Sequence, residues 1–248
     1  MLSGEALPGL PEVQPGDDLA ALLAASAERI GGLRASDVLC VAHKVVSKAE
    51  GRMRRLADVA PGARARELAE RYDRDPRHVQ CVLDEAADVL RADAGRLICR
   101  TRHGFVCANA GVDRSNAGAE DTAILLPSDP DASARALREK LGCAVVITDS
   151  FGRPWRIGQA EVAIGCAGLR VLDDWRGRVD GTGRELHATL IAVADEAASA
   201  ADLARAGKDA GEPAVRLRGL ERFVLGAGEA GPGAVSALVR PLDQDLFR

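Results

Sequence analysis

The chain has 248 residues, enough for one large domain or two small ones, and 47% of them are apolar although only 3% are aromatic. Its formal net charge of −4 gives no electrostatic basis for binding nucleic acid. No apolar run reaches the roughly 20 residues that a membrane span needs, and the N-terminus lacks the basic-then-apolar order of a signal peptide. We therefore expect a cytoplasmic protein that binds neither nucleic acid nor membranes.

The cysteines and histidines exclude a zinc site. The six cysteines form no CxxC pair, and nearly all lie in apolar runs, where a free thiol packs as a small apolar group. The four histidines are scattered and form no HExxH motif. We predict that the cysteines are buried in the core.

Apolar periodicity and capping residues predict alternating helices and strands. In chain order these are helix 18–30, strand 37–43, helix 75–90, two strands within 95–111 that turn at His103–Gly104, helix 129–142, strand 144–150, a strand followed by a helix within 184–207, and strand 213–220. The hairpin argues against a purely parallel sheet, so we predict an α+β fold, with α/β as the alternative. No linker or repeat interrupts the pattern, which predicts a single unit over residues 1–248, built as one body or as two intertwined subdomains.

Three of the predicted strands end in polar side chains. The groups are His43, Lys44 and Lys48 after the first strand, Asn109 and Asp113 after the second, and Asp149 and Ser150 after the third. Strand ends that lie side by side place such groups at one rim of a sheet, where binding sites usually lie. Two carboxylates, a hydroxyl and lysines suit Mg²⁺ together with phosphate, because Mg²⁺ is usually held by one or two carboxylates, phosphate and water.

The segment ITDSFGRPWRIGQ (147–159) predicts an anion-binding turn. We expect Asp149 and Ser150 to leave the strand there, while Arg153 and Arg156 bracket the turn. The planar guanidinium of arginine binds phosphate or carboxylate through two donors. A surface turn in which Arg156 stacks on Trp155 is the alternative.

The stretch NAGVDRSNAG (109–118) has two interpretations. It forms a turn rich in Asx residues that satisfies its own backbone, or it presents Asp113 to a metal. A calcium loop is excluded because its twelfth position is Ile124 instead of glutamate. GAGEAG (226–231) spells the dinucleotide fingerprint, but only 17 residues follow it, too few for the rest of that fold.

Several segments together resemble the coenzyme F420-0:L-glutamate ligase (F420 γ-glutamyl ligase) family. They are LPGLPEVQPGDDLA (7–20), VLCVAHKVVSKAEGR (38–52), GFVCANAGVDRSN (104–116), ITDSFGRPWRIGQAEVAIGCAG (147–168), DGTGREL with ADEAASAADL (180–203), and PAVRLRGL (213–220). They span almost the whole chain in the family's order.

The resemblance implies a GTP-dependent ligase that joins L-glutamate to the carboxylate of a deazaflavin phosphodiester and adds a further glutamate through the γ-carboxylate. It implies a homodimer of mixed α and β structure, GTP as co-substrate, one or two Mg²⁺ or Mn²⁺ ions per site, and K⁺ as a further candidate. By resemblance, Asp113 and Asp149 hold a divalent metal and Ser150 touches a second one. The implied GTP contacts are Pro8, Gly9, Leu10 and Pro11 within Leu7–Pro11, then His43, Lys44, Lys48, Asn116, and Lys208 in the loop after Leu203.

The chemistry is consistent with this assignment. A carboxylate does not react with an amine at neutral pH until it carries a leaving group, and phosphorylation by GTP supplies one as an acyl phosphate. Such a reaction needs a metal, cations around the transferring group and accurate positioning. We expect Asp113 and Asp149 to supply the metal, and Lys48 with Arg153 or Arg156 to supply the cations.

One position departs from the family pattern. Some members place a carboxylate for the second metal where this chain has Gly207. Asp209 or Glu196 takes that role, or phosphate and water hold the second ion, so the number of metals stays open. Some relatives also carry a flavin-binding reductase domain, and because this chain stops at PLDQDLFR we expect that activity to be absent.

Two other functions stay open. A GTP- or ATP-dependent carboxylate–amine ligase with a different acceptor would need the same residues, because acceptor choice depends on the shape of the pocket. A nucleotide- or metal-binding protein without catalysis is the third possibility.

Overall fold

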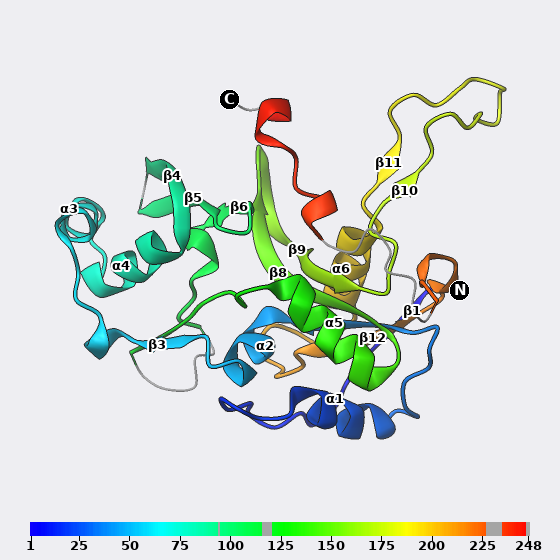
Figure 1. Ribbon diagram of the computed structural model, residues 1–248, viewed down its shortest axis with the longest axis horizontal. Helices are drawn as coiled ribbons and strands as arrows, with labels where there is room; N and C mark the ends of the chain where they lie inside the picture. Colours follow the sequence, from blue (N-terminus) through cyan, green and yellow to red (C-terminus); the bar gives the residue numbers. More distant parts are fainter. Residues whose placement is uncertain (94, 116–120, 227–234, 247–248) are drawn as a thin grey trace.

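The computed structural model describes residues 1–248 except 94, 116–120, 227–234 and 247–248 (Figure 1). Helices combine with sheets that contain parallel and antiparallel strands, which confirms the predicted α+β class. The helices are α1 (Leu19–Glu28), α2 (His43–Ala49), α3 (Ala63–Tyr72), α4 (Pro76–Glu85), α5 (Pro130–Leu141) and α6 (Val193–Ala204). The strands are β1 (Ser3–Ala6), β2 (Val38–Ala42), β3 (Met53–Arg55), β4 (Ala86–Asp93), β5 (Arg96–Thr101), β6 (Val106–Ala108), β7 (Thr122–Ile124), β8 (Ala144–Arg153), β9 (Arg156–Ala167), β10 (Asp173–Asp174), β11 (Leu190–Ile191) and β12 (Ala214–Arg218).

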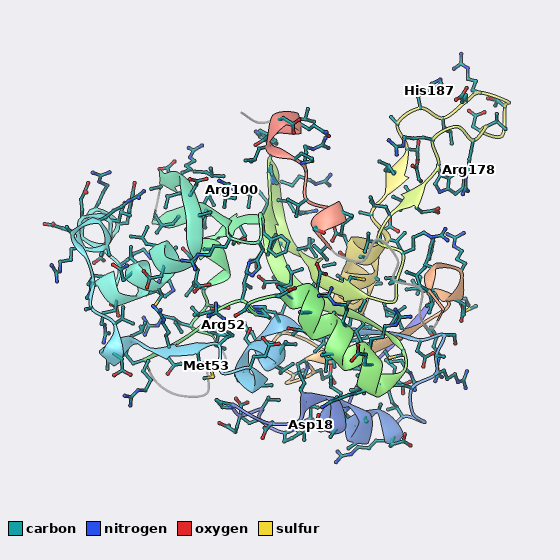
Figure 2. The ribbon with its side chains drawn as sticks, in the orientation of Figure 1. Asp18, Arg52, Met53, Arg100, Arg178 and His187 are labelled. Atoms are coloured by element: carbon teal, nitrogen blue, oxygen red, sulfur yellow. The ribbon has the colours of Figure 1, made fainter. Side chains whose placement is uncertain are left out.

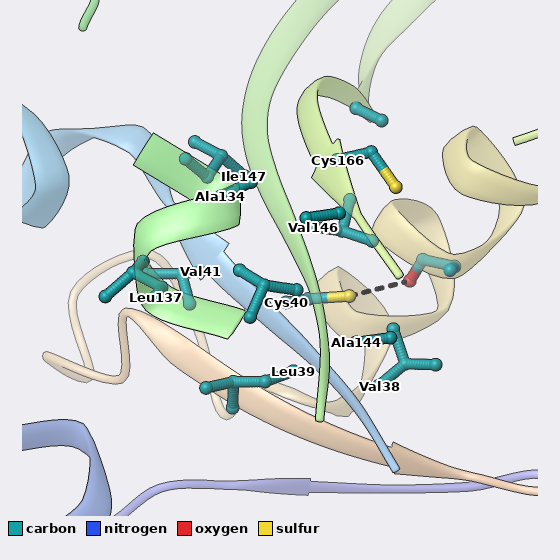
Figure 3. Packing of buried hydrophobic residues seen from close by; sticks show 14 of the residues in the cluster. Val38, Leu39, Cys40, Val41, Ala134, Leu137, Ala144, Val146, Ile147 and Cys166 are labelled. Atoms are coloured by element: carbon teal, nitrogen blue, oxygen red, sulfur yellow. Dashed lines mark hydrogen bonds between the residues drawn. The ribbon is translucent and has the colours of Figure 1, made fainter. Parts of the chain in front are cut away.

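The main sheet has the strand order β1-β12-β2-β8-β9, and β2 and β8 form its parallel pair. Strand β2 and the first four residues of β8, Ala144–Ile147, are continuous apolar runs, as expected for strands covered by helices on both faces. Figure 3 shows Val41 and Ile147 on the side of α5, while the Cys40 thiol points to α6 and donates to the Ala197 carbonyl over 3.6 Å. All six cysteines are buried and free, as predicted.

A second, smaller hydrophobic core lies beside the main sheet. Helices α3 and α4 pack there against the antiparallel sheet β4-β5-β6, on the left in Figure 1. The chain enters this lobe after α2 and returns to the main sheet at α5. The single unit predicted over residues 1–248 stays a prediction.

The capping residues place several helices and turns as expected. The Asp18 and Asp129 carboxylates accept backbone N–H groups at the starts of α1 and α5, and α5 ends before Gly142 with a left-handed φ of 71°. Strands β5 and β6 pair in antiparallel fashion on either side of His103–Gly104. These elements confirm the predicted helices 18–30 and 129–142 and the predicted hairpin.

The predicted helix 75–90 is wrong beyond Glu85. The Asp75 side chain starts α4 by accepting from the Arg77 N–H over 2.9 Å, but the chain extends from Ala86 and pairs with β5. The segment AADVLRAD has helix-forming residues, yet pairing with a neighbouring strand outweighs that local preference.

The prediction that Asp149 and Ser150 leave the strand is also wrong. Strand β8 continues to Arg153 and turns back into β9 through Pro154 and Trp155, whose φ is +56°. The long hairpin satisfies backbone groups that a loop would leave to water. Both residues therefore project from a paired strand.

An arm between β10 and β11 extends away from the main body, with Arg178 and His187 near its end (Figure 2). In the part of the chain that the structure describes, no helix is long and apolar enough to cross a membrane.

Candidate active site

Four segments that are distant in the sequence meet at one rim of the main sheet. Ala42 ends β2 beside Thr148 of β8, and its N–H donates to the Pro213 carbonyl over 2.7 Å. The Leu7 N–H donates to the Ala214 carbonyl over 2.9 Å, which brings the end of β1 to the same place. A cavity of about 300 Å³ lies there, lined by residues 10–13, 42–45, 48, 148–150, 161, 205, 207–209 and 211–213.

Helix α2 begins directly at the end of β2, so His43 enters the cavity wall at the strand end. Its ring is buried, with Nε2 3.4 Å from the Asp149 Oδ1 and Nδ1 3.4 Å from the Ser47 Oγ. Because β2 and β8 are parallel and Ala42 pairs with Thr148, the end of β2 lies beside the middle of β8 and places these two side chains together.

The next residue, Lys44, binds the other predicted carboxylate. Its Nζ lies 2.6 Å from the Asp113 Oδ2 and 2.6 Å from the Ser115 Oγ. Partial burial would raise the pKa of Asp113, but hydrogen bonds from Lys44 and Ser115 lower it to about 2. Two consecutive residues of α2 thus contact both predicted metal ligands, although Asp113 itself does not line the cavity.

The backbone around Asp113 accounts for the polar residues 109–115, the described part of the stretch 109–118. Asn109, Ala110 and Gly111 have φ values of 54°, 51° and 73°, and a Cβ on Gly111 would lie 2.6 Å from the Leu126 side chain. The Asp113 carboxylate accepts the Ser115 N–H over 2.8 Å, which is an Asx turn. The turn is present, and the metal role of Asp113 stays a prediction.

Lys48 is buried in the cavity wall and forms an ion pair with Glu12. Of the segment predicted to contact GTP, Leu10 and Pro11 line the cavity, whereas Pro8 and Gly9 do not. Sequence reasoning did not identify Glu12, because an acid in a loop after several prolines has no distinctive pattern.

Sequence reasoning also missed Glu161, the most buried carboxylate of the cavity, whose side chain is 3% exposed. It lies opposite Ser150 in the β8–β9 ladder, and the Ser150 Oγ donates to its Oε1 over 2.5 Å. The Lys208 Nζ donates to the same Oε1 over 2.6 Å and to the Ser150 Oγ over 2.9 Å. Recognising the hairpin in the sequence would have placed Glu161 beside Ser150.

Arg205 lies next to the buried Glu161 carboxylate. Its Nη1 is 3.9 Å from the Glu161 Oε2, and its side chain is 6% exposed. The Nε and Nη2 atoms are buried and have no hydrogen-bond partner among the residues that the structure describes. A buried guanidinium with unused donors is costly without an anion or water to accept from it.

The other predicted groups lie outside the cavity. Arg153 and Arg156 face each other at the exposed tip of the β8–β9 hairpin, where Arg153 donates to the Ile157 carbonyl over 2.7 Å. Asn116 and residues 227–231 of GAGEAG lie outside the described residues.

The three positions considered for a second metal lie in two places. Gly207 and Asp209 line the cavity, whereas Glu196 is exposed in the first turn of α6. Within the described ranges, no group of three or more His, Cys, Asp or Glu side chains is arranged to hold a metal ion. The protein therefore offers single carboxylates along the rim.

Comparisons with known proteins identify the family. The family described as F420-0:Gamma-glutamyl ligase matches residues 9–219. The chain is 46% identical to a protein of Methanopyrus kandleri across 98% of this chain and 96% of that protein. It is 43% identical to one of Methanothermobacter thermautotrophicus, across 97% and 96%, and 41% identical to one of Archaeoglobus fulgidus, across 97% and 94%. All three carry the name coenzyme F420:L-glutamate ligase.

The predicted resemblance is thus confirmed over most of the chain. The chain belongs to the F420-0:γ-glutamyl ligase family.

Proposed function

We propose that this chain is a GTP-dependent ligase that forms an amide bond between L-glutamate and the terminal carboxylate of the deazaflavin F420-0. The names of the relatives support the ligase reaction and its acceptor. The observation that carries the proposal is a rim cavity with four cationic side chains, Lys44, Lys48, Arg205 and Lys208, among its lining residues. All three substrates carry negative charge, and clustered cations favour their binding.

The unused donors of Arg205 support an anionic ligand in this cavity. A phosphate or carboxylate oxygen is the strongest acceptor for a guanidinium, because both partners carry charge. Lys48 is a buried lining residue as well, and among the described residues it is paired with a single carboxylate, Glu12. Triphosphate groups fit such a lining better than an apolar ligand does.

The rim residues fit one divalent cation. Asp113 and Asp149 offer carboxylate oxygens, the ligand type that Mg²⁺ and Mn²⁺ prefer, and phosphate and water would complete the shell. When bound, such an ion neutralises charge on the phosphate oxygens during transfer. His43 orients Asp149 through the 3.4 Å contact, and Lys44 holds Asp113 in its place.

The reaction has two chemical steps. The γ-phosphoryl group of GTP passes to a carboxylate oxygen of the acceptor, the bond to GDP breaks, and an acyl phosphate forms. The amine of glutamate then attacks the acyl carbon, the C–N bond forms, phosphate leaves and the amine gives its proton to solvent. Lys48 and Lys208 contribute fixed positive charge near the transferring group, and the walls of the cavity hold the reactants together.

The test combines purified protein with GTP, Mg²⁺ or Mn²⁺, L-glutamate and F420-0, and determines the product by mass spectrometry. We expect a mass gain of one or more glutamyl units that is lost when GTP or metal is omitted. ATP in place of GTP tests the choice of nucleotide. Sedimentation of the same sample tests the homodimer that we propose for this chain.

The variant Asp149→Asn separates the possible functions. A catalyst would lose turnover by about 100-fold or more while its fold is retained, whereas a protein that only binds nucleotide would lose affinity alone. GTP binding without any mass gain would favour a carboxylate–amine ligase with another acceptor. Absence of both would overturn the proposal.

A further inference from the structure

The wall of the cavity formed by β8 and β9 contains a network of hydrogen bonds around Lys208. Lys208 approaches it from the loop after α6, with its Nζ 2.6 Å from the Glu161 Oε1, 2.9 Å from the Ser150 Oγ and 2.9 Å from the Asp202 Oδ1. An ammonium group has three N–H donors, so these three acceptors match its capacity. The charge of Lys208 is thus fixed at one place in the lining.

The carboxylate of this network is buried. Glu161 is almost inaccessible, accepts from Ser150 and Lys208, and lies 3.9 Å from the Arg205 Nη1. It therefore depends on neighbouring cations. Removing one partner of a buried ion pair is costly because the other charge is left without compensation.

The charges of the network are already balanced. Lys208 and Arg205 carry two positive charges, and Glu161 and Asp202 carry two negative ones. A divalent ion bound to Ser150 and Glu161 would have to expel the ammonium or lie against it. The residues around Ser150 therefore do not fit a second divalent metal.

We propose that the Lys208 ammonium serves as the second cation of this site, so that the chain binds one divalent ion per site, at Asp113 and Asp149. This inference rests on the proposed function, because it concerns the charge that faces the transferring phosphate. Gly207, which precedes the lysine, has no side chain with which to bind a metal. Glu161 is then a positioning residue that holds Lys208, although it does not itself meet the substrates.

The number of bound Mn²⁺ ions tests the inference directly. Free Mn²⁺ is measured by electron paramagnetic resonance in a titration of the full-length protein with a non-hydrolysable GTP analogue present. We expect one ion per site in the unaltered protein. The variants Lys208→Met and Lys208→Glu both remove the ammonium. We expect the Lys208→Glu variant to bind two ions, because it adds a carboxylate beside Ser150 and Glu161.

Lys140→Met is the matched control. Lys140 is 61% exposed and pairs with Asp18 over 3.1 Å, while Lys208 is 62% exposed, so the two differ mainly in what surrounds their partners. We expect the control to bind one ion. Circular dichroism of each variant confirms that it is folded, and the count for the unaltered protein does not depend on any variant.

Two outcomes overturn the inference alone. Two ions in the unaltered protein would show that Lys208 does not replace a metal. One ion in a folded Lys208→Glu variant would show that the ammonium is not what excludes a second ion. Both leave the proposed function intact as long as the nucleotide binds with metal. If neither Mn²⁺ nor the analogue binds, both the inference and the proposed function are wrong.

Discussion

Two clusters that each contain a carboxylate, a lysine and a serine lie along the rim, and their carboxylates differ in burial. Asp113, Lys44 and Ser115 form one, and in it the lysine contacts both the carboxylate and the serine hydroxyl. The second cluster repeats this arrangement with a glutamate, Lys208 and a serine. The Asp113 side chain is 43% exposed, whereas the glutamate of the second cluster, Glu161, is 3% exposed.

The difference in burial determines whether a divalent ion can displace the lysine of each cluster. An exposed ion pair contributes only about 0–1 kcal/mol, so a divalent ion can displace Lys44 from Asp113 at little cost. Glu161 is 3% exposed and would be left as a buried charge without compensation if the 62% exposed Lys208 were displaced, which keeps Lys208 on Glu161. The exposed cluster is suited to bind and release a metal, and the buried cluster is suited to hold a permanent charge.

The largest expected effect is on catalysis at the exposed cluster. Asp113→Asn keeps the shape of the side chain but removes the charge that would hold the metal, and we expect turnover to fall by about 100-fold or more. Turnover is measured as release of phosphate in the presence of all substrates. Asp58→Asn, an exposed carboxylate paired with Arg55 outside the cavity, is the control. Equal turnover in the two variants would contradict the metal role.

A smaller effect is expected on stability at the buried cluster. Glu161→Gln leaves Asp202 as the one remaining carboxylate paired with Lys208 and Arg205 among the described residues, and we expect the free energy of unfolding to fall by about 1–3 kcal/mol. Asp113→Asn should change it by less than about 1 kcal/mol. Urea denaturation measures both. If the two losses are the same, burial does not distinguish the clusters.

The stability of the protein in acid should also depend on these clusters. The folded pKa of Asp113 is about 2, below its ordinary value of 3.8, so ionised Asp113 stabilises the fold above about pH 4. That contribution is lost as the pH falls toward 2, and the lowered pKa of Glu161 acts in the same direction below its ordinary value of 4.5. We expect the urea midpoint to fall less steeply between pH 4 and 2 in Asp113→Asn than in the unaltered protein. An unchanged slope would exclude the Lys44 contact in solution.

The smallest expected effect concerns the competition between Lys44 and the metal. Lys44→Met removes the cation that occupies Asp113, and we expect Mn²⁺ affinity without nucleotide to rise by up to about fivefold, the equivalent of about 1 kcal/mol. Isothermal titration calorimetry measures the change. Weaker Mn²⁺ binding would mean that Lys44 supports the metal site instead of competing with it.

Local patterns in the sequence determined much of the fold. The apolar runs VLCVA and AVVIT predicted buried strands, and aspartates at positions 18 and 129 marked the starts of two helices, because capping and burial depend on neighbouring residues. The polar residues that follow the expected strands also predicted a site at one rim of the sheet, and the structure brings His43 at the end of β2 together with Asp149 within β8. The division into two cores had no comparable pattern in the sequence.

The tertiary structure alone decided how the clusters are built. Whether Ala86–Asp93 continues a helix or becomes a strand depends on a partner strand that lies ahead in the chain. In the sequence, Glu161 is one polar residue before an apolar run. Only the hairpin register places it opposite Ser150, where it accepts a hydrogen bond from Lys208. The sequence lists the charges of the rim, but their burial and pairing follow from contacts between distant segments, and those contacts determine which carboxylate can hold a metal.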